Sequence, residues 1–281
     1  MGKTVLEVGP GPGPLSRSIL KLRPKVLTVV EKDRRFIPAL ETIQSAVPPG
    51  MMQIHRGDIL KVNETEIFQQ AGAVKADWEA ASTPNMIVGN LPFGVATELL
   101  IKWIHCIPTR SGPFAFGRVP MLLMFQKEVA MRICAKPHTK EYGRLSVMVQ
   151  NTCDARCLFD IDGAAFVPPP KVKATVVLIE PRVNPHSDVH LDALEFVLRQ
   201  TFGQRRKMLA NSIKTIGPDA TELIELAKLD KSKRPEDLTI TEWCALANAY
   251  YDWPKRPPTD LTPFTDELQR LYEMSKMTKQ L

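Results

Sequence analysis

The sequence of 281 residues predicts an α/β fold with a mostly parallel sheet, followed by a small all-helical domain. Up to about residue 180, short runs of β-branched and apolar residues alternate with segments of helical periodicity, as strand and helix units do. After Pro181 such runs end and only helical patterns follow. We therefore expect one domain over 1–182, a helical domain over 183–250 and a loosely attached tail over 251–281.

Each expected element follows from its own pattern. Apolar runs rich in β-branched residues predict strands over 4–8, 26–31, 51–56, 85–89, 121–126, 147–159 and 174–179. The last two are close in sequence, as an antiparallel edge pair would be. Apolar residues at helical spacing predict helices over 15–22, 36–43, 64–70, 191–202, 205–216, 221–228 and 241–250.

Composition excludes several classes of protein. A hydrophobic fraction of 44% and a charged fraction of 24% are values of a globular chain, and the net charge of +6 is moderate. The five cysteines are an odd number without repeated CxxC spacing, so neither a disulfide framework nor a metal site is predicted. No apolar run approaches the roughly 18 residues that a membrane span requires, so we expect no membrane partner.

A glycine-rich turn follows the first expected strand. The segment Glu7-Val8-Gly9-Pro10-Gly11-Pro12-Gly13 ends a strand and opens a helix, and its glycines allow the backbone to approach a ligand closely. The two prolines lack N–H groups, which argues against the phosphate-binding turn of a dehydrogenase. The turn therefore favours an adenosine ligand without a phosphate, such as S-adenosylmethionine, although a tight strand-to-helix connection alone would also explain it.

Two carboxylates are expected at the same sheet edge. Glu31 ends the second strand 22 residues after Gly9, close to the spacing at which a carboxylate binds ribose hydroxyls. Asp58 follows the third strand, where it could accept a hydrogen bond from an adenine amine. Asp33 is instead expected to cap the following helix. Alone, each carboxylate is more often structural, but successive strand ends place them together.

The fourth strand ends in Asn90-Leu91-Pro92-Phe93. With the glycine turn, this tetrapeptide resembles the Asn/Asp-Pro-Pro-aromatic class of amino-methyltransferases, in the form typical of ribosomal RNA adenine dimethyltransferases. The resemblance implies a Rossmann-like class I methyltransferase sheet and S-adenosylmethionine as cofactor. It also implies that the helical domain binds RNA. The residues then expected at the cofactor are Glu7, Gly9, Gly11, Gly13, Glu31, Lys32, Asp58, Ile59 and Asn90.

The tetrapeptide suits methylation of an adenine amine, which is a poor nucleophile because its lone pair is conjugated into the ring. The Asn90 amide oxygen and the Leu91 carbonyl could each accept an N6 hydrogen and direct the nitrogen. Pro92 would fix the carbonyl, and Phe93 would stack on the base. No catalytic His, Cys or metal is expected. The alternative is a plain loop with Phe93 in the core.

Further segments extend the resemblance from Val5 to about Tyr250, among them 142–147, 166–172 and 202–207. The amino-acid sequence at 101–103, 112–114 and 125–130 is most similar to the mitochondrial transcription factor B branch of this family. That branch implies a mitochondrial matrix enzyme that dimethylates two adjacent adenines in a stem-loop of small-subunit ribosomal RNA, acting as a monomer. The family's N-terminal cofactor-covering segment and a targeting peptide are expected upstream of this sequence.

Two basic segments are candidates for RNA binding. Phe196 to Pro218 contains no acidic residue, and the loop 136–144 is also basic. Both could contact phosphates, although a solvated surface is the commoner fate of such charges. The residues selected are Lys140, Arg144, Arg205, Arg206 and Lys207. A rival hypothesis is a non-catalytic factor in mitochondrial transcription or ribosome assembly, which would not need the Asn90 tetrapeptide.

Overall fold

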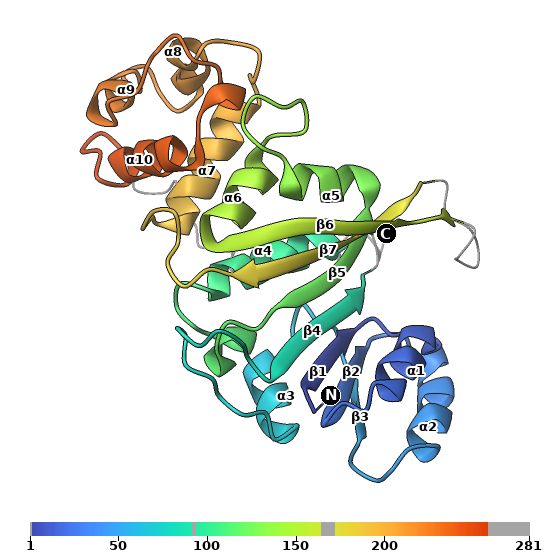
Figure 1. Ribbon diagram of the computed structural model, residues 1–281. Helices are drawn as coiled ribbons and strands as arrows, with labels where there is room; N and C mark the ends of the chain where they lie inside the picture. Colours follow the sequence, from blue (N-terminus) through green and yellow to red (C-terminus); the bar gives the residue numbers. More distant parts are fainter. Residues whose placement is uncertain (1, 92–93, 164–171, 258–281) are drawn as a thin grey trace, which may run out of the picture. The chain divides into compact units, whose positions relative to one another are not determined.

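The computed structural model describes residues 2–91, 94–163 and 172–257. Its sheet has seven strands in the order β3-β2-β1-β4-β5-β7-β6 (Figure 1). The first five strands are parallel, and β7 is antiparallel to both of its neighbours. The strands are β1 Thr4–Val8, β2 Val26–Glu31, β3 Met52–Arg56, β4 Asn85–Asn90, β5 Met121–Gln126, β6 Cys153–Ile161 and β7 Ala174–Pro181.

Helices pack on the parallel strands, which explains why the strands in the middle of the sheet are largely buried. All five residues of β1 are buried, as expected when both faces of a sheet are covered. Ile19 of α1 and Leu40 of α2 join Val5 and Leu27 of the strands in one apolar cluster. The helices of this part are α1 Pro14–Lys21, α2 Ile37–Ser45, α3 Glu64–Gln70, α4 Ala96–Cys106 and α5 Lys127–Cys134, with short 3-10 helices η1 Arg34–Phe36 and η2 Gly112–Phe116.

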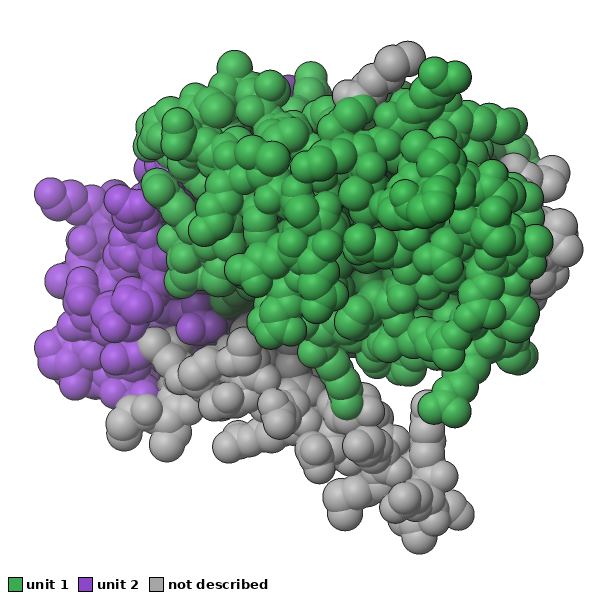
Figure 2. Space-filling view, turned by 90° about the horizontal axis from the view of Figure 1, so that it is seen from below, with its two compact units in different colours: residues 1–134, 152–184 green, residues 135–151, 185–281 purple. Residues whose placement is uncertain are grey.

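The chain divides into two compact units (Figure 2). Unit 1 comprises Met1–Cys134 and Thr152–Asn184, and unit 2 comprises Ala135–Asn151 and Pro185–Leu281. Unit 2 is helical, and an aromatic stack of Phe196 on Tyr250, with ring centroids 4.9 Å apart, lies in its core. Its helices are α6 Arg144–Thr152, α7 Leu191–Phe202, α8 Leu209–Ser212, α9 Glu222–Leu226 and α10 Ile240–Tyr251, with η4 Ile213–Thr215 and η5 Pro235–Asp237.

The structure confirms most of the expected elements and corrects two. The expected strand over 147–159 is wrong in its first part, because residues 147–152 belong to α6 and β6 begins only at Cys153. The expected helix over 205–216 is regular only from Leu209, where α8 and then η4 form. In the part of the chain that the structure describes, no helix is long and apolar enough to span a membrane.

Candidate active site

The strand order brings four strand ends together at the carboxyl edge of the sheet. β1 lies between β2 and β4, and β3 flanks β2. Val8 is paired with Val30 on one side and with Gly89 on the other, so the glycine turn begins beside both neighbouring strand ends. Ligands of open α/β sheets bind at this edge. The residues expected from the sequence to bind cofactor and base therefore share one side of unit 1.

The glycine turn has the conformation that requires glycine. Gly9, Gly11 and Gly13 have φ values of 64°, 56° and 87°, in the left-handed region that other residues rarely adopt. A Cβ on Gly13 would collide with the side chain of Ile43 in α2, whereas a Cβ on Gly11 would meet nothing within 4 Å. Gly13 thus packs the start of α1 closely, and the space beside Gly11 is open.

Glu31 holds the glycine turn in place. Its carboxylate accepts hydrogen bonds from the Gly11 N–H at 3.0 Å and from the Asp33 N–H at 2.7 Å. Each oxygen keeps a lone pair for a further donor. Asp33 accepts from the Arg35 N–H at 2.9 Å and begins η1, which confirms the expected cap. The Arg35 side chain and N–H lower the pKa of Asp33 to about 2.

Asp58 is the second carboxylate at this edge. It accepts from the Lys32 ammonium at 2.7 Å and from the Leu60 N–H at 3.1 Å. Partial burial favours its neutral form, but these hydrogen bonds and the charges of Lys32 and Lys61 outweigh burial, so the pKa of Asp58 is lowered. Glu31, Lys32 and Asp58 line a cavity of about 640 Å³ together with Arg34, Ile37, Pro38, Glu41, Arg56 and Gly57.

Glu98 of α4 was not among the residues expected at the site. Burial and the negative charge of Asp58 raise the pKa of Glu98. No sequence pattern selects it, because a Glu in the first turn of a helix is ordinarily explained by the helix dipole. The influence of the Asp58 charge indicates that Glu98 lies near the strand end that carries Asp58.

A buried network holds the segment that follows Asp58. The Glu64 carboxylate, 3% exposed, accepts from the Lys102 ammonium at 2.7 Å and from the Trp103 indole N–H at 2.9 Å. Lys102 also donates to the carbonyls of Ile59 and Val62, at 3.1 and 3.4 Å. Hydrogen bonds from Lys102 and Trp103 therefore hold residues 59–64 against α4. Ile59, expected at the cofactor, is itself buried.

Glu7 is buried within the sheet. Neither of its carboxylate oxygens has a hydrogen-bond partner among the described residues, and Ser16 Oγ beside it is likewise unpartnered. Burial raises the pKa of Glu7 to about 7, opposed by the nearby Ser16 hydroxyl and reinforced by the charge of Glu31. A carboxyl group with this pKa changes its protonation state near neutral pH, which is unusual for a structural residue.

The tetrapeptide expected at the target base begins at the end of β4. Asn90 is its last residue, and its side chain is exposed and forms no hydrogen bond with the described residues. Leu91 is buried, with 1% of its surface exposed, and it packs near Gly89. Pro92 and Phe93 lie outside the described residues, as does most of the expected signature 166–172. Among the described residues, no group of His, Cys, Asp and Glu is arranged to hold a metal ion.

Comparison with protein families decides the classification. The model of the family described as ribosomal RNA adenine dimethylase matches residues 2–252. The chain belongs to this family. Membership identifies it as an enzyme that dimethylates adenine in ribosomal RNA, and it confirms the family that the Asn90 tetrapeptide and the glycine turn indicated.

Relatives named mitochondrial dimethyladenosine transferase 1 are similar along most of the chain. The protein from Vermamoeba vermiformis is 47% identical, with 91% of this chain and 84% of the relative covered. The human protein is 42% identical, with 88% and 72% covered. The bacterial ribosomal RNA small subunit methyltransferase A of Phenylobacterium zucineum is also 42% identical, with 92% and 82% covered.

Solved structures share the fold. A dimethyladenosine transferase from Plasmodium falciparum superposes with a TM-score of 0.65 at 21% identity, covering 87% of this chain and 88% of that one. The 23S rRNA methyltransferase ErmE superposes with a TM-score of 0.57 at 20% identity, covering 88% and 91%. These likenesses confirm the expected Rossmann-like methyltransferase fold of this family member.

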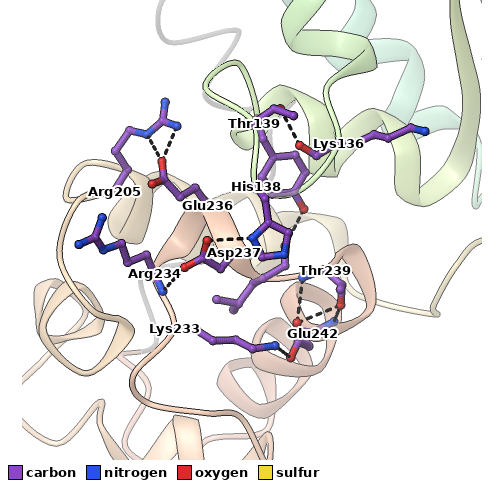
Figure 3. Close-up of polar contacts among 12 residues, drawn as sticks. Lys136, His138, Thr139, Arg205, Lys233, Arg234, Glu236, Asp237, Thr239 and Glu242 are labelled. Carbon is purple, nitrogen blue, oxygen red and sulfur yellow. Dashed lines mark hydrogen bonds and ion pairs between the residues drawn. The ribbon is translucent and has the colours of Figure 1, made fainter.

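The five basic residues selected for RNA binding all lie in unit 2 of the enzyme. Arg205 is committed to internal contacts, because its guanidinium donates to Glu236 at 2.6 and 3.0 Å (Figure 3). It also donates to the Lys140 carbonyl at 2.8 Å. Arg144 donates to Glu195 at 3.3 Å. The side chains of Lys140, Arg206 and Lys207 are exposed.

The hydrogen bond from Arg205 to the Lys140 carbonyl joins the two basic segments of unit 2. His138 lies in the same loop as Lys140, and its ring Nδ1 is 3.0 Å from Asp237 Oδ1 (Figure 3). The backbone N–H of His138 donates to the Glu236 carbonyl. The η5 helix thus contacts both the loop 136–140, through His138, and the segment that carries Arg205. Pairing of Arg205 with a carboxylate is an alternative from the sequence, but its partner cannot be identified there, because Glu236 lies 31 residues from Arg205. Asp237 likewise lies 99 residues from His138.

Proposed function

We propose that this enzyme transfers methyl groups from S-adenosylmethionine to the N6 amines of two adjacent adenines in a stem-loop of small-subunit ribosomal RNA. The observation that carries the proposal is the position of Asn90. It follows Gly89, which is paired with Val8 immediately before the glycine turn. An exposed amide acceptor thus lies at the strand next to the turn that would hold the methyl donor, which suits a transfer between two bound groups.

The residues present fit S-adenosylmethionine. Glu31 retains acceptor capacity for ribose hydroxyls while it holds Gly11, and Asp58 offers a second acceptor toward the adenine amine. The space beside Gly11 is open. Glu7 supplies unpartnered carboxylate oxygens beneath the turn. The cofactor would supply a methyl group on a sulfonium, which is an activated electrophile.

In this mechanism the protein positions the amine and needs no strong base. The Asn90 amide oxygen and the Leu91 carbonyl would each accept one N6 hydrogen, which localises the lone pair on the nitrogen and directs it toward the methyl group. Phe93 would stack on the adenine, a contact worth about 1–3 kcal/mol. The surplus proton can leave after the transfer, when the nitrogen is cationic. The same acceptors can then hold the monomethylated amine for the second transfer.

The test is the substitution Asn90→Ala. Loss of a hydrogen bond that positions the reacting group should reduce methyl transfer to small-subunit RNA by about 100-fold or more. The affinity for S-adenosylmethionine, measured by calorimetry, should change little. Asn211→Ala is the matched control, since Asn211 is exposed in α8 of unit 2. Undiminished transfer by Asn90→Ala would refute the assigned role.

The RNA target can be tested with the same enzyme. A stem-loop containing two adjacent adenines should yield two dimethylated nucleotides by mass spectrometry. Replacement of either adenine by guanine should leave one dimethylated nucleotide. A product that stops at monomethylation would contradict the proposed reaction. Normal ribosome assembly with Asn90→Ala in place of the native protein would instead favour a non-catalytic assembly role.

We place the enzyme in the mitochondrial matrix, acting as a monomer on the ribosomal small subunit, because relatives at 42–47% identity carry mitochondrial names. The proposed location predicts that the gene product, carrying a C-terminal tag, is protected from protease in intact mitochondria. Cytosolic recovery of the tagged product would contradict it.

A further inference from the structure

Two cysteines of unit 1 lie in contact on neighbouring elements. Cys134 is the last residue of α5, and Cys157 lies in β6, the edge strand of the sheet. Their sulfur atoms are 3.3 Å apart. The Cys157 Sγ also lies 3.7 Å from the Ala130 carbonyl of α5, so the side chain of Cys157 is directed at this helix. The sequence gives no CxxC signal for the pair, because 22 residues separate the two positions.

We propose that Cys134 and Cys157 are a thiol modification site that closes to a reversible disulfide when the protein meets a low-molecular-weight disulfide such as oxidised glutathione. A disulfide requires a sulfur separation of about 2.05 Å, so the two atoms must approach by roughly 1.3 Å. Side-chain rotation with a small backbone shift would supply this approach.

The backbone at Cys157 can accommodate that shift. β6 is hydrogen-bonded to β7 on one side only, and its register with β7 shifts between Cys157 and Phe159. Such a bulge interrupts the hydrogen-bond ladder locally and bends the strand. Cys157 therefore lies beside a local irregularity of the strand, whereas Cys134 is the last residue of helix α5.

The exposure of the two thiols fixes their order of reaction. Cys157 is exposed and Cys134 is half-buried. Burial, together with the neighbouring Cys157, raises the pKa of Cys134 to about 12, so Cys134 stays a thiol until it reacts. Cys157 would attack oxidised glutathione, forming a mixed disulfide and releasing one glutathione. Cys134 would then attack the Cys157 sulfur, lose its proton and release the second glutathione. Two thiols are oxidised and one glutathione disulfide is reduced to two thiols.

The bond would close a covalent loop around residues 135–151, the whole of the first segment of unit 2. A loop of this length restricts the unfolded chain and so stabilises the folded protein against thermal unfolding. The same segment carries Lys140 and Arg144, so the redox state of the pair would act on a region expected to bind RNA. The disulfide itself does not depend on that assignment.

The experiment incubates the full chain in glutathione buffers of increasing oxidised fraction and counts free thiols by maleimide labelling after denaturation. Of the five cysteines, two should become unreactive, leaving three. Tryptic mapping should join peptides 133–140 and 157–171. Dithiothreitol should restore all five thiols and lower the unfolding temperature again.

The variants Cys134→Ser and Cys157→Ser should each abolish the crosslink, while the control Cys106→Ser, at a half-buried thiol elsewhere in unit 1, should retain it. Glutathione that remains attached to Cys157 with Cys134 unmodified would overturn the proposal. A disulfide that joins two copies of the chain, or a different pair of cysteines, would also overturn it. Mapping of the native sequence keeps the test decisive even where a serine variant folds poorly.

Discussion

Glu7 combines burial with a carboxyl group that lacks hydrogen-bond partners in the described part of the chain, which is energetically unfavourable for a residue within a strand. Its two oxygens have no partner among the described residues, and its ordinary pKa is raised to about 7. Burial is the main cause of this raised pKa; the Ser16 hydroxyl opposes it and the Glu31 charge adds to it. In the unfolded chain the pKa would be near 4.5. Folding is therefore coupled to protonation of this single side chain.

The coupling predicts a pH-dependent effect of Glu7→Gln. Because the folded pKa is raised, the contribution of Glu7 to stability is fully present below pH 4.5 and is lost as pH rises to about 7. The neutral glutamine avoids this loss. The difference in unfolding free energy between Glu7→Gln and the native protein should thus shift in favour of the variant by about 2–3 kcal/mol between pH 5 and pH 8.

Urea denaturation at the two pH values measures this shift. Glu66→Gln is the control, since Glu66 is exposed in α3 and the same change of residue should leave the pH dependence unaltered. A constant difference between Glu7→Gln and the native protein across this pH range would show that Glu7 keeps one protonation state.

At the scale of the elements, α4 connects the two halves of the candidate site. It follows the Asn90 tetrapeptide in the chain, and Lys102 and Trp103 on it hold Glu64 and the carbonyls after Asp58. An ion pair with one partner 3% and the other 17% exposed is largely withdrawn from water. Removal of one partner leaves the other charge buried, which is more costly than removal of both.

Lys102→Met should therefore destabilise the enzyme by about 3 kcal/mol, and Lys102→Met combined with Glu64→Gln should recover part of that loss. Chemical denaturation of the single and double variants measures both values. Lys127→Met is the matched control, because the Lys127–Asp160 pair is 49% and 43% exposed and should contribute less than about 1 kcal/mol. Equal effects of the two lysine substitutions would contradict the role given to burial.

The elements also show where sequence patterns are ambiguous. The run Leu145 to Val149 is buried at every position, so it lacks the polar face that marks most helices. A short apolar run of this kind is equally typical of a buried strand, and length alone could not distinguish the two. A local contact marks this run as the start of a helix. Ser146 Oγ accepts from the Gly143 N–H at 3.1 Å, as a side chain in the first turn of a helix does.

At the scale of the whole molecule, the sequence was most informative where a residue type has one physical purpose. The positive φ angles of the glycine turn and the cap at Asp33 follow directly from residue type. The partners of Glu64, Arg205 and His138 could not be predicted, because each depends on side chains 31 to 99 residues away. Contacts of that kind are set by the packing of the folded chain rather than by any local pattern.

Unit 2 offers a prediction about RNA binding that separates its arginines. Arg206 and Lys207 are exposed, whereas Arg205 is held by Glu236 and the Lys140 carbonyl. Arg206→Ala and Lys207→Ala should each reduce the slope of log affinity against log salt by about one, since each removes one phosphate contact. Arg205→Ala should instead lower the unfolding temperature.

Filter binding of the RNA stem-loop over a series of salt concentrations measures the slope, and thermal denaturation measures stability. The control is Lys21→Ala, at an exposed basic residue of α1 in unit 1, which should leave the slope unchanged. Unaltered slopes for both Arg206→Ala and Lys207→Ala would remove this segment from the RNA interface.

The discontinuous course of unit 2 also constrains how it can fold. Residues 135–151 leave the ribosome well before the second segment of unit 2, which begins at Pro185. The Tyr142 hydroxyl nevertheless donates to the Leu238 carbonyl, 96 positions later. Arg205 likewise pairs with Glu236, which is synthesised after it. Such distant pairings slow folding, because a long loop must close before the contacts that stabilise it can form. During synthesis, the Tyr142 side chain therefore stays without its final hydrogen-bond partner until the segment around Leu238 emerges. This interval is when the nascent chain would be most exposed to chaperones and to aggregation.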